Sequence, residues 1–155
     1  GLAVSLAWSR GGKAQYVLEG NINYTGAVIT WMQKQLHLIA DPAEAEALAR
    51  EANAEDTTYM VPAFTGLGAP YWNSQATALI TGMTRLTGRA ELVKAGLTSI
   101  AYQIRDVVAA MDRAVKPLGG EGLSAIRADG GPTRNPNLMQ FQADILGFPV
   151  EVPQS

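Results

Sequence analysis

A glycine-rich turn late in the chain holds the residues best suited to chemistry. Asp129-Gly130-Gly131 follows a short predicted strand, and Asn135 begins a predicted helix. Glycine lets the backbone approach a ligand closely, and a helix N-terminus favours an anion. One interpretation is a nucleotide site in which Gly130 and Gly131 lie against the ligand and Asn135 hydrogen-bonds it. The other is an ordinary strand-to-helix turn in which Asn135 only caps the helix, and the residues alone favour this second interpretation.

Other reactive groups are few. The chain has no GxxxxGK[ST] motif and no GxGxxG after a predicted strand. It has no cysteine and one histidine, His37, which excludes disulfides, thiolate metal sites and histidine-clustered metal sites. We expect His37 on the surface at a helix end, and Trp31 with Met32 in the core. The acidic residues near position 55 are expected to be a solvated helix end; they are Glu51, Glu55 and Asp56.

Composition narrows the class of protein further. The 155 residues are 47% hydrophobic and 17% charged, with a formal net charge of −2. Such a chain has enough apolar material for a core, and it lacks the basic surface that nucleic acids or anionic membranes require. No apolar run approaches the ~20 residues of a spanning helix. We therefore expect no nucleic-acid or membrane partner and a cytoplasmic location.

The elements that position the turn follow from hydrophobic periodicity and from turn signals. Strands are predicted at 2–8, 14–18, 58–61, 76–81, 124–128 and 148–152, and helices at 24–39, 43–52, 91–116 and 135–146. Asp41 is the predicted N-cap of the second helix. The apolar loop at 62–72 is expected to pack against a neighbouring domain, a ligand or the protein's own body. This order predicts an α/β domain with a mixed sheet flanked by helices.

Several motifs resemble one known family. They are Glu19-Gly20 with Tyr24-Thr25-Gly26-Ala27, the segments 61–72, 82–85 and 100–106, and Asp129-Gly130-Gly131 with 138–147. In this order they resemble the C-terminal domain of the FGGY carbohydrate kinases, and within that family the glycerol kinases. The resemblance covers nearly the whole chain.

The resemblance implies a ribonuclease H-like (actin-like ATPase) domain, incomplete within residues 1–155, which forms the C-terminal nucleotide-binding half of an ATP-dependent kinase. Carried over by position, Gly131 and Asn135 would contact the adenosine end of ATP, and Gly130 would shape the turn. Gly26 and Thr30 would also line the nucleotide site. ATP and Mg²⁺ are the implied cofactors. The implied reaction phosphorylates a polyol or sugar hydroxyl, with glycerol to glycerol 3-phosphate as the expected case.

The resemblance also implies what lies outside this chain. The family's catalytic aspartate, most polyol contacts and a phosphate-binding loop precede Gly1, in an N-terminal domain of the same protein. None of Asp106, Asp129 or Asp144 matches that aspartate, so no catalytic residue is assigned here and the isolated fragment is expected to be inactive. Formation of a homo-oligomer stays open.

Three positions depart from the glycerol kinase pattern. Thr30 replaces a frequent glutamine, Asn73 replaces an aspartate, and Thr98 replaces an acidic residue. These changes leave open a kinase of another sugar or polyol, such as xylulose. The absence of the catalytic half leaves open a different class of protein, a non-catalytic actin-like binding module.

Overall fold

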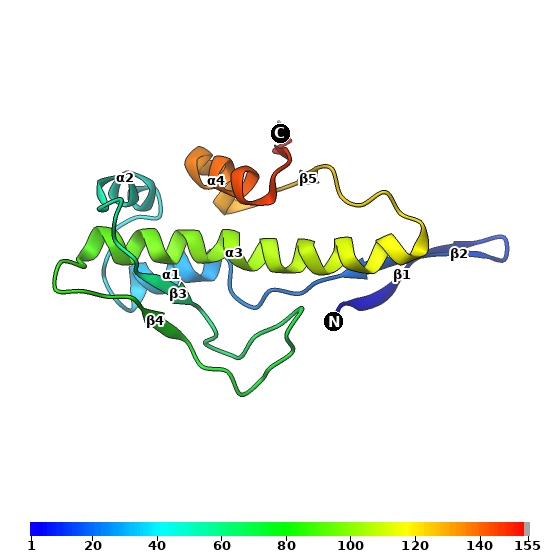
Figure 1. Ribbon diagram of the computed structural model, residues 1–155, viewed down its shortest axis with the longest axis horizontal. Coiled ribbons are helices and arrows are strands. Elements are labelled where there is room, and N and C mark those ends of the chain that lie inside the picture. The colour runs from blue at the N-terminus through cyan, green and yellow to red at the C-terminus, as the bar shows by residue number, and fades with distance from the viewer. Residues whose placement is uncertain (154–155) are drawn as a thin grey trace.

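The computed structural model describes residues 1–153 and confirms the predicted order of elements. The strands are β1 (Ala3–Arg10), β2 (Lys13–Glu19), β3 (Tyr59–Val61), β4 (Leu79–Thr81), β5 (Ile126–Arg127) and β6 (Val150–Glu151). The helices are α1 (Gly26–Lys34), α2 (Glu44–Glu51), α3 (Arg89–Val115) and α4 (Pro136–Leu146), with 3₁₀ turns at Lys116–Leu118 and Gly131–Arg134. Figure 1 shows these elements arranged along α3.

The single mixed sheet predicted from the sequence is not formed by the described residues. They form three separate two-stranded sheets: β1 with β2 and β3 with β4 are antiparallel, and β5 with β6 is parallel. The strands after the first hairpin are only two or three residues long, and each described strand has a single partner. Because no strand in residues 1–153 pairs on both edges, the three pairs are separate within these residues.

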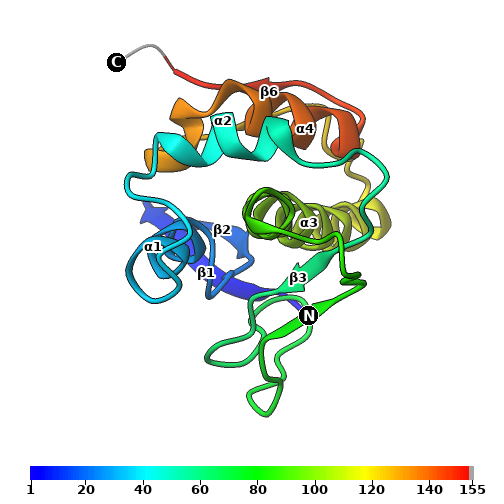
Figure 2. The ribbon, with the colours of Figure 1, turned by 90° about the vertical axis from the view of Figure 1, so that its left-hand side faces the viewer.

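The long helix α3 is the centre of the molecule. Its 27 residues span about 40 Å, with α2 and α4 on one side and α1 on another (Figure 2). The predicted apolar stripe is buried at Val93, Leu97, Ile100 and Val107. Facing it are Val28 and Met32 of α1, both fully buried. This confirms the expected core role of Met32, while Trp31 is partly buried against the same cluster.

The first helix is shorter than predicted. It ends at Lys34, and His37 has a φ of 52°, a left-handed conformation that no helix can continue through. His37 is exposed in the connecting loop rather than in a helix, and Ile39 reaches the core from that loop. Ile39 continues the apolar spacing of the helix, and no glycine or proline lies between Lys34 and Ile39. The sequence pattern therefore predicted a longer helix.

The second helix begins three residues after its predicted cap. Asp41 Oδ1 accepts a hydrogen bond from Ala43 N at 2.7 Å, and Glu44 Oε2 accepts one from Ala40 N at 2.8 Å. The side-chain bonds typical of a helix start are therefore present, but they fix a turn at 40–43 before α2 begins at Glu44.

The apolar loop at 62–72 packs partly on the protein's own body. The Phe64 ring lies 4.9 Å from that of Tyr24 and 4.6 Å from that of Trp31, measured between centroids. Ala69 N donates to Asn21 O at 2.8 Å. Tyr71 and Trp72 stay more than half exposed. Of the three partners expected for this loop, the contacts of Phe64 confirm packing on the protein's own body.

Candidate functional site

The turn at 129–135 is shaped by its own hydrogen bonds. Gly130 has φ 103° and ψ −179°, a combination that only glycine adopts readily. Gly130 N donates to Asp129 Oδ1 at 2.6 Å, and Gly130 O accepts from Thr133 N at 3.1 Å and from Thr133 Oγ1 at 2.7 Å. Gly130 therefore shapes the turn, as expected from the sequence.

The outer face of this turn is open. A Cβ atom added at Gly130 or at Gly131 would meet no atom within 4 Å, and both residues are exposed. Gly131 does not have the left-handed φ of Gly130. The fold accounts for glycine at position 130 but gives no steric reason for glycine at position 131. A ligand that needs close access to the backbone would supply one.

Asn135 carries out the helix-capping role that the sequence left as one alternative. Its Oδ1 accepts a hydrogen bond from Leu138 N at 2.9 Å, at the start of α4. Because the carbonyl oxygen is committed to the cap, the Nδ2 group is the free end of the side chain, and it can only donate. Nδ2 has no hydrogen-bond partner among residues 1–153. The cap and a ligand contact are therefore compatible.

The start of α1 lies against the same turn. A Cβ atom at Gly26 would be 3.5 Å from Pro132 Cγ, so the structure brings Gly26 next to the residue that follows Gly131. Thr25 makes no side-chain cap to α1, although its carbonyl oxygen accepts from Val28 N at 3.0 Å. The N–H groups of Gly26 and Ala27 are therefore the ones available to an anion. Thr30 is exposed one turn further along and shares the helix face of Gly26.

Asn135 also lines a small hollow. It has a volume of about 120 Å³ and lies where α2, α3 and the start of α4 meet. Its lining includes Lys94, Thr98 and Leu138. Ligand pockets usually measure about 300–1,000 Å³, so this hollow alone is too small to enclose a nucleotide. The turn itself is open on its outer face.

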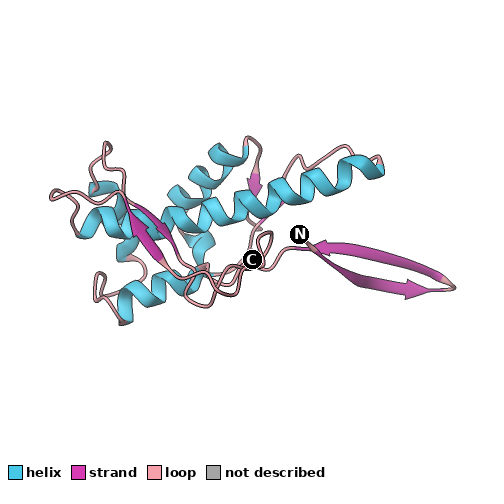
Figure 3. Ribbon diagram, turned by 60° about the horizontal axis from the view of Figure 1, so that its bottom comes forward, coloured by secondary structure: helices cyan, strands magenta, loops and turns pink. Residues whose placement is uncertain are grey.

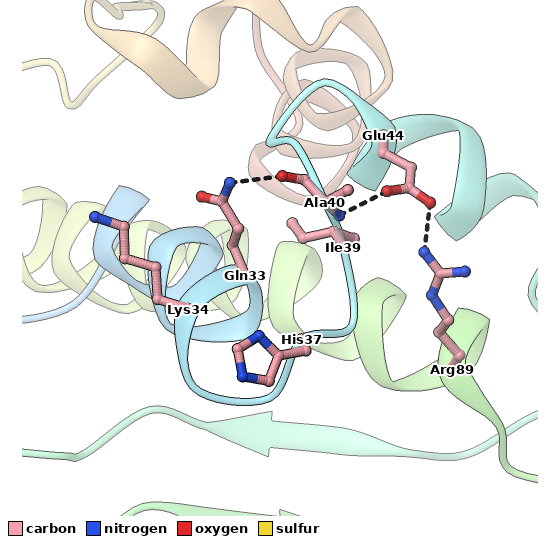
Figure 4. Close-up of a pocket in the computed structure, with 7 residues that line it drawn as sticks. All are labelled: Gln33, Lys34, His37, Ile39, Ala40, Glu44 and Arg89. Carbon is pink, nitrogen blue, oxygen red and sulfur yellow. Dashed lines mark hydrogen bonds and ion pairs between the residues drawn. The ribbon is translucent and has the colours of Figure 1, made fainter.

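A larger hollow of about 770 Å³ lies at the other end of α1 (Figure 4). The Glu44 carboxylate connects two sides of this hollow. It accepts a hydrogen bond from Ala40 N and forms an ion pair with Arg89. The Ala40 bond, followed by the Arg89 bond, holds the pKa of Glu44 below its ordinary value. None of the predicted nucleotide-binding residues lines this hollow, and its charged pair joins the starts of α2 and α3. We assign it a structural role.

The three aspartates considered as catalytic bases all have hydrogen-bond partners. Asp106 accepts a hydrogen bond from Tyr71 Oη at 2.7 Å, and this bond raises the pKa of Tyr71. Asp129 accepts one from Gly130 N, and Asp144 accepts one from Gln140 Nε2 at 2.8 Å.

Within residues 1–153 there is no group of three or more His, Cys, Asp or Glu side chains that could hold a metal ion. In the same residues, no helix has both the length and the apolar character needed to cross a bilayer.

Two of the departures from the family pattern are accommodated locally. Asn73 Oδ1 accepts from Gln75 N at 3.0 Å, as an aspartate at this position could. Thr98 Oγ1 bonds back to Lys94 O at 3.0 Å within α3. Both side chains are thus satisfied by hydrogen bonds within their own segments.

Comparison with known proteins defines the class of this domain. The model of the FGGY family of carbohydrate kinases, C-terminal domain, matches residues 3–155. The glycerol kinase of Carboxydothermus hydrogenoformans is 48% identical over 99% of this chain. The glycerol kinase of Plasmodium falciparum, solved with ADP, superposes with a TM-score of 0.86 at 37% identity over the whole chain. The xylulose kinase of Rhodospirillum rubrum superposes at 0.78, with 28% identity over 97% of it.

The chain belongs to the FGGY family of carbohydrate kinases, and the matching region is the C-terminal domain of that family. It spans about 30% of the length of the two glycerol kinases and 29% of the xylulose kinase.

Proposed function

We propose that this chain is the nucleotide-binding half of an ATP-dependent kinase that phosphorylates a polyol, with glycerol as the substrate. The backbone of Gly130 and Gly131 lies against the nucleotide, Asn135 Nδ2 donates a hydrogen bond to it, and Gly26 with Thr30 lines the opposite side. We also propose the actin-like ATPase architecture for the whole domain, which the superposition on the Plasmodium falciparum glycerol kinase supports. Its companion is the N-terminal part of the same protein.

The open turn at Gly131 carries this proposal. Its backbone is accessible, its glycine has no role in packing, and it lies beside the uncapped start of α1. The Plasmodium falciparum glycerol kinase solved with ADP supports a nucleotide as the ligand. Because the adjoining hollow measures only about 120 Å³, the N-terminal part would supply the second wall of the site.

The residues of this chain fit ATP better than they fit a metal ion. Mg²⁺ at kinase sites is held by one or two carboxylates together with phosphate oxygens. When bound, the ion neutralises charge on the phosphates during transfer. Asp129, the carboxylate nearest the turn, already accepts a bond from Gly130 N. We therefore assign no metal ligand to the described residues.

The substrate is tested with the full-length protein and a panel of glycerol, xylulose and other polyols and sugars. Phosphorylation of glycerol at the highest kcat/KM is the expected result. A preference for xylulose would support the alternative suggested by the Rhodospirillum rubrum enzyme. Failure to phosphorylate any polyol or sugar, with ATP still bound, would contradict the proposal and favour a non-catalytic binding module.

A further inference from the structure

Arg134 lies within the glycine turn, between two of the residues proposed to bind the nucleotide. It is the last residue of the 3₁₀ turn Gly131–Arg134, and Asn135 follows it. The turn is closed by hydrogen bonds between residues three apart, such as that from Asn135 N to Pro132 O at 3.1 Å. A 3₁₀ helix has three residues per turn, so side chains at positions i and i+3 lie one above the other. Arg134 is therefore on the same face of the turn as Gly131.

The space over Gly131 on this face is open. A Cβ atom at Gly131 would meet no atom within 4 Å, so the Arg134 side chain is not folded over the Gly131 backbone. At a rise of about 2 Å per residue, the two residues are about 6 Å apart along the axis of the turn. A cation interacts with an aromatic ring when it lies over the ring face within about 6 Å of the centroid. The face therefore has room for one flat ring beside the guanidinium.

The Arg134 guanidinium has no ion-pair partner and no hydrogen-bond partner within residues 1–153. The ion pairs among these residues engage other basic side chains, which are Arg50, Arg89, Lys116 and Arg127. Asp129, in the same turn, accepts a hydrogen bond from Gly130 N instead. Because Arg134 is also exposed, no contact within the described chain holds its planar group away from a ligand at Gly131.

The charged end of a nucleotide has a different place at this turn. The free N–H groups at the start of α1 belong to Gly26 and Ala27, and Gly26 lies against Pro132. Successive residues of a 3₁₀ turn are about 120° apart around its axis, so Pro132 is on a different face from Gly131 and Arg134. Phosphates at the start of α1 would therefore lie on the Pro132 side. The face that Arg134 shares with Gly131 is left for the uncharged, flat end of the molecule.

We propose that the guanidinium of Arg134 stacks on the purine base of the nucleotide, whose edge lies against the Gly131 backbone. The inference rests on the proposed function, because it takes a nucleotide as the ligand of this turn. A guanidinium is planar and weakly hydrated, which suits it to the face of an aromatic ring. Arg134 is thus a binding residue for the base, and it has no part in moving the phosphoryl group.

Binding of ATP, adenosine and inorganic tripolyphosphate to the full-length protein tests this inference. Wild type and Arg134→Ala are compared, with ATP measured by calorimetry and the other two by competition against ATP. We expect Arg134→Ala to weaken ATP and adenosine by the same factor of about five, and to leave tripolyphosphate unchanged. Wild-type affinity for ATP and adenosine would overturn the proposal. A loss shared by tripolyphosphate would also overturn it, since Arg134 would then contact phosphate.

Arg134→Lys separates stacking from charge. Lysine keeps the positive charge but lacks the planar group, so we expect the adenosine affinity to stay closer to that of Arg134→Ala than to that of wild type. Full recovery with lysine would contradict stacking. Arg10→Ala is the matched control, because Arg10 is an exposed arginine without an ion pair among the described residues, at the end of β1. Figure 3 shows the β1–β2 hairpin extending away from the helices. This control should bind all three ligands as wild type does.

The melting temperature of Arg134→Ala completes the test. Because Arg134 is exposed and lacks a partner within residues 1–153, we expect the melting temperature to stay at the wild-type value. A lowered melting temperature with unchanged adenosine affinity would make Arg134 a structural residue and overturn the proposal. Failure of the proposed function looks different, since the wild-type protein itself would then not bind ATP.

Discussion

At the scale of single residues, Asn135 shows how one side chain can cap a helix and keep a hydrogen-bond donor free. Its Oδ1 caps α4 by accepting a hydrogen bond from Leu138 N. Because this bond holds the amide plane, it also sets the direction in which Nδ2 points. The sequence presented capping and ligand binding as alternatives, because sequence position does not show which end of the amide is used. In the structure the carbonyl end of the amide caps α4, which leaves the NH₂ end available for the proposed ligand contact.

Substitution of Asn135 separates the two roles. Asn135→Ser keeps an oxygen that can cap α4 but removes the amide donor, whereas Asn135→Ala removes both. We expect Asn135→Ser to retain nearly the wild-type melting temperature and to weaken ATP binding about tenfold, the loss of one hydrogen bond of about 1.4 kcal/mol. Asn135→Ala should in addition lose about 1 kcal/mol of stability. Unchanged ATP binding in both variants, measured by calorimetry, would show that Asn135 is only a cap.

Glu91 is more than the solvated charge that its helix position predicts. Its carboxylate accepts from Asn53 N and from Gly88 N, both at 2.9 Å, and so joins the end of α2 to the start of α3. These bonds, with that from Asn53 the stronger cause, lower the pKa of Glu91. A lowered pKa in the folded state means that the stabilisation is complete above the ordinary glutamate pKa. It is lost as the pH falls through the lowered value.

Acid unfolding tests this role of Glu91. We expect Glu91→Gln to lower the melting temperature at pH 7. We also expect it to reduce the further decrease that begins below the ordinary glutamate pKa of about 4.3 and continues through the lowered pKa of the folded wild type. Glu55→Gln, at an exposed position, is the control and should follow the wild-type curve. Identical curves for Glu91→Gln and wild type would contradict the role.

At the scale of elements, the packing of α1 on α3 determines where the start of α1 meets the glycine turn. Gly96 of α3 makes this close approach feasible: a Cβ atom there would lie 2.5 Å from Met32 Sδ and 3.4 Å from Val28 Cγ1. Periodicity predicted that both helices exist and which residues they bury. It could not predict the contact of Gly26 with Pro132, which depends on how two distant segments are oriented.

Gly96→Ala tests this packing. Alanine is favoured over glycine in a helix by about 1 kcal/mol, but overpacking of a core costs about 1–3 kcal/mol. Because Met32 is fully buried, its side chain must shift within the core to admit the methyl group, and we expect a net loss of about 1–2 kcal/mol in the free energy of unfolding. Combining Gly96→Ala with Met32→Ala should give a smaller loss than the sum of the single changes. Exact additivity in urea unfolding would contradict this contact.

At the scale of the whole molecule, the sequence pattern predicted the order of helices and strands well, but it did not predict which strands pair. The order of ten strands and helices and the cap at Asn135 follow from nearby residues, and the structure confirms them. The α/β class is confirmed, but the described residues do not join their strands into one mixed sheet. Strand pairing depends on partners remote in sequence, and the hairpin of β1 and β2 has no third strand among the described residues. The end of α1 at Lys34 was also missed, because the left-handed His37 carries no sequence signal. The described residues thus form a body built on α3, with an open turn at 129–135 and an exposed β1–β2 hairpin.

The most direct test of the nucleotide site is the ATP affinity of the full-length protein carrying Gly131→Ala, measured by calorimetry beside its melting temperature. A Cβ atom at this position meets nothing within 4 Å, so the fold itself should tolerate the change and the melting temperature should not move. A nucleotide lying against the backbone would meet the added methyl group, and we expect ATP to bind about tenfold more weakly, or about 1.4 kcal/mol. Wild-type ATP affinity together with an unchanged melting temperature would contradict the assignment of this turn as the nucleotide site.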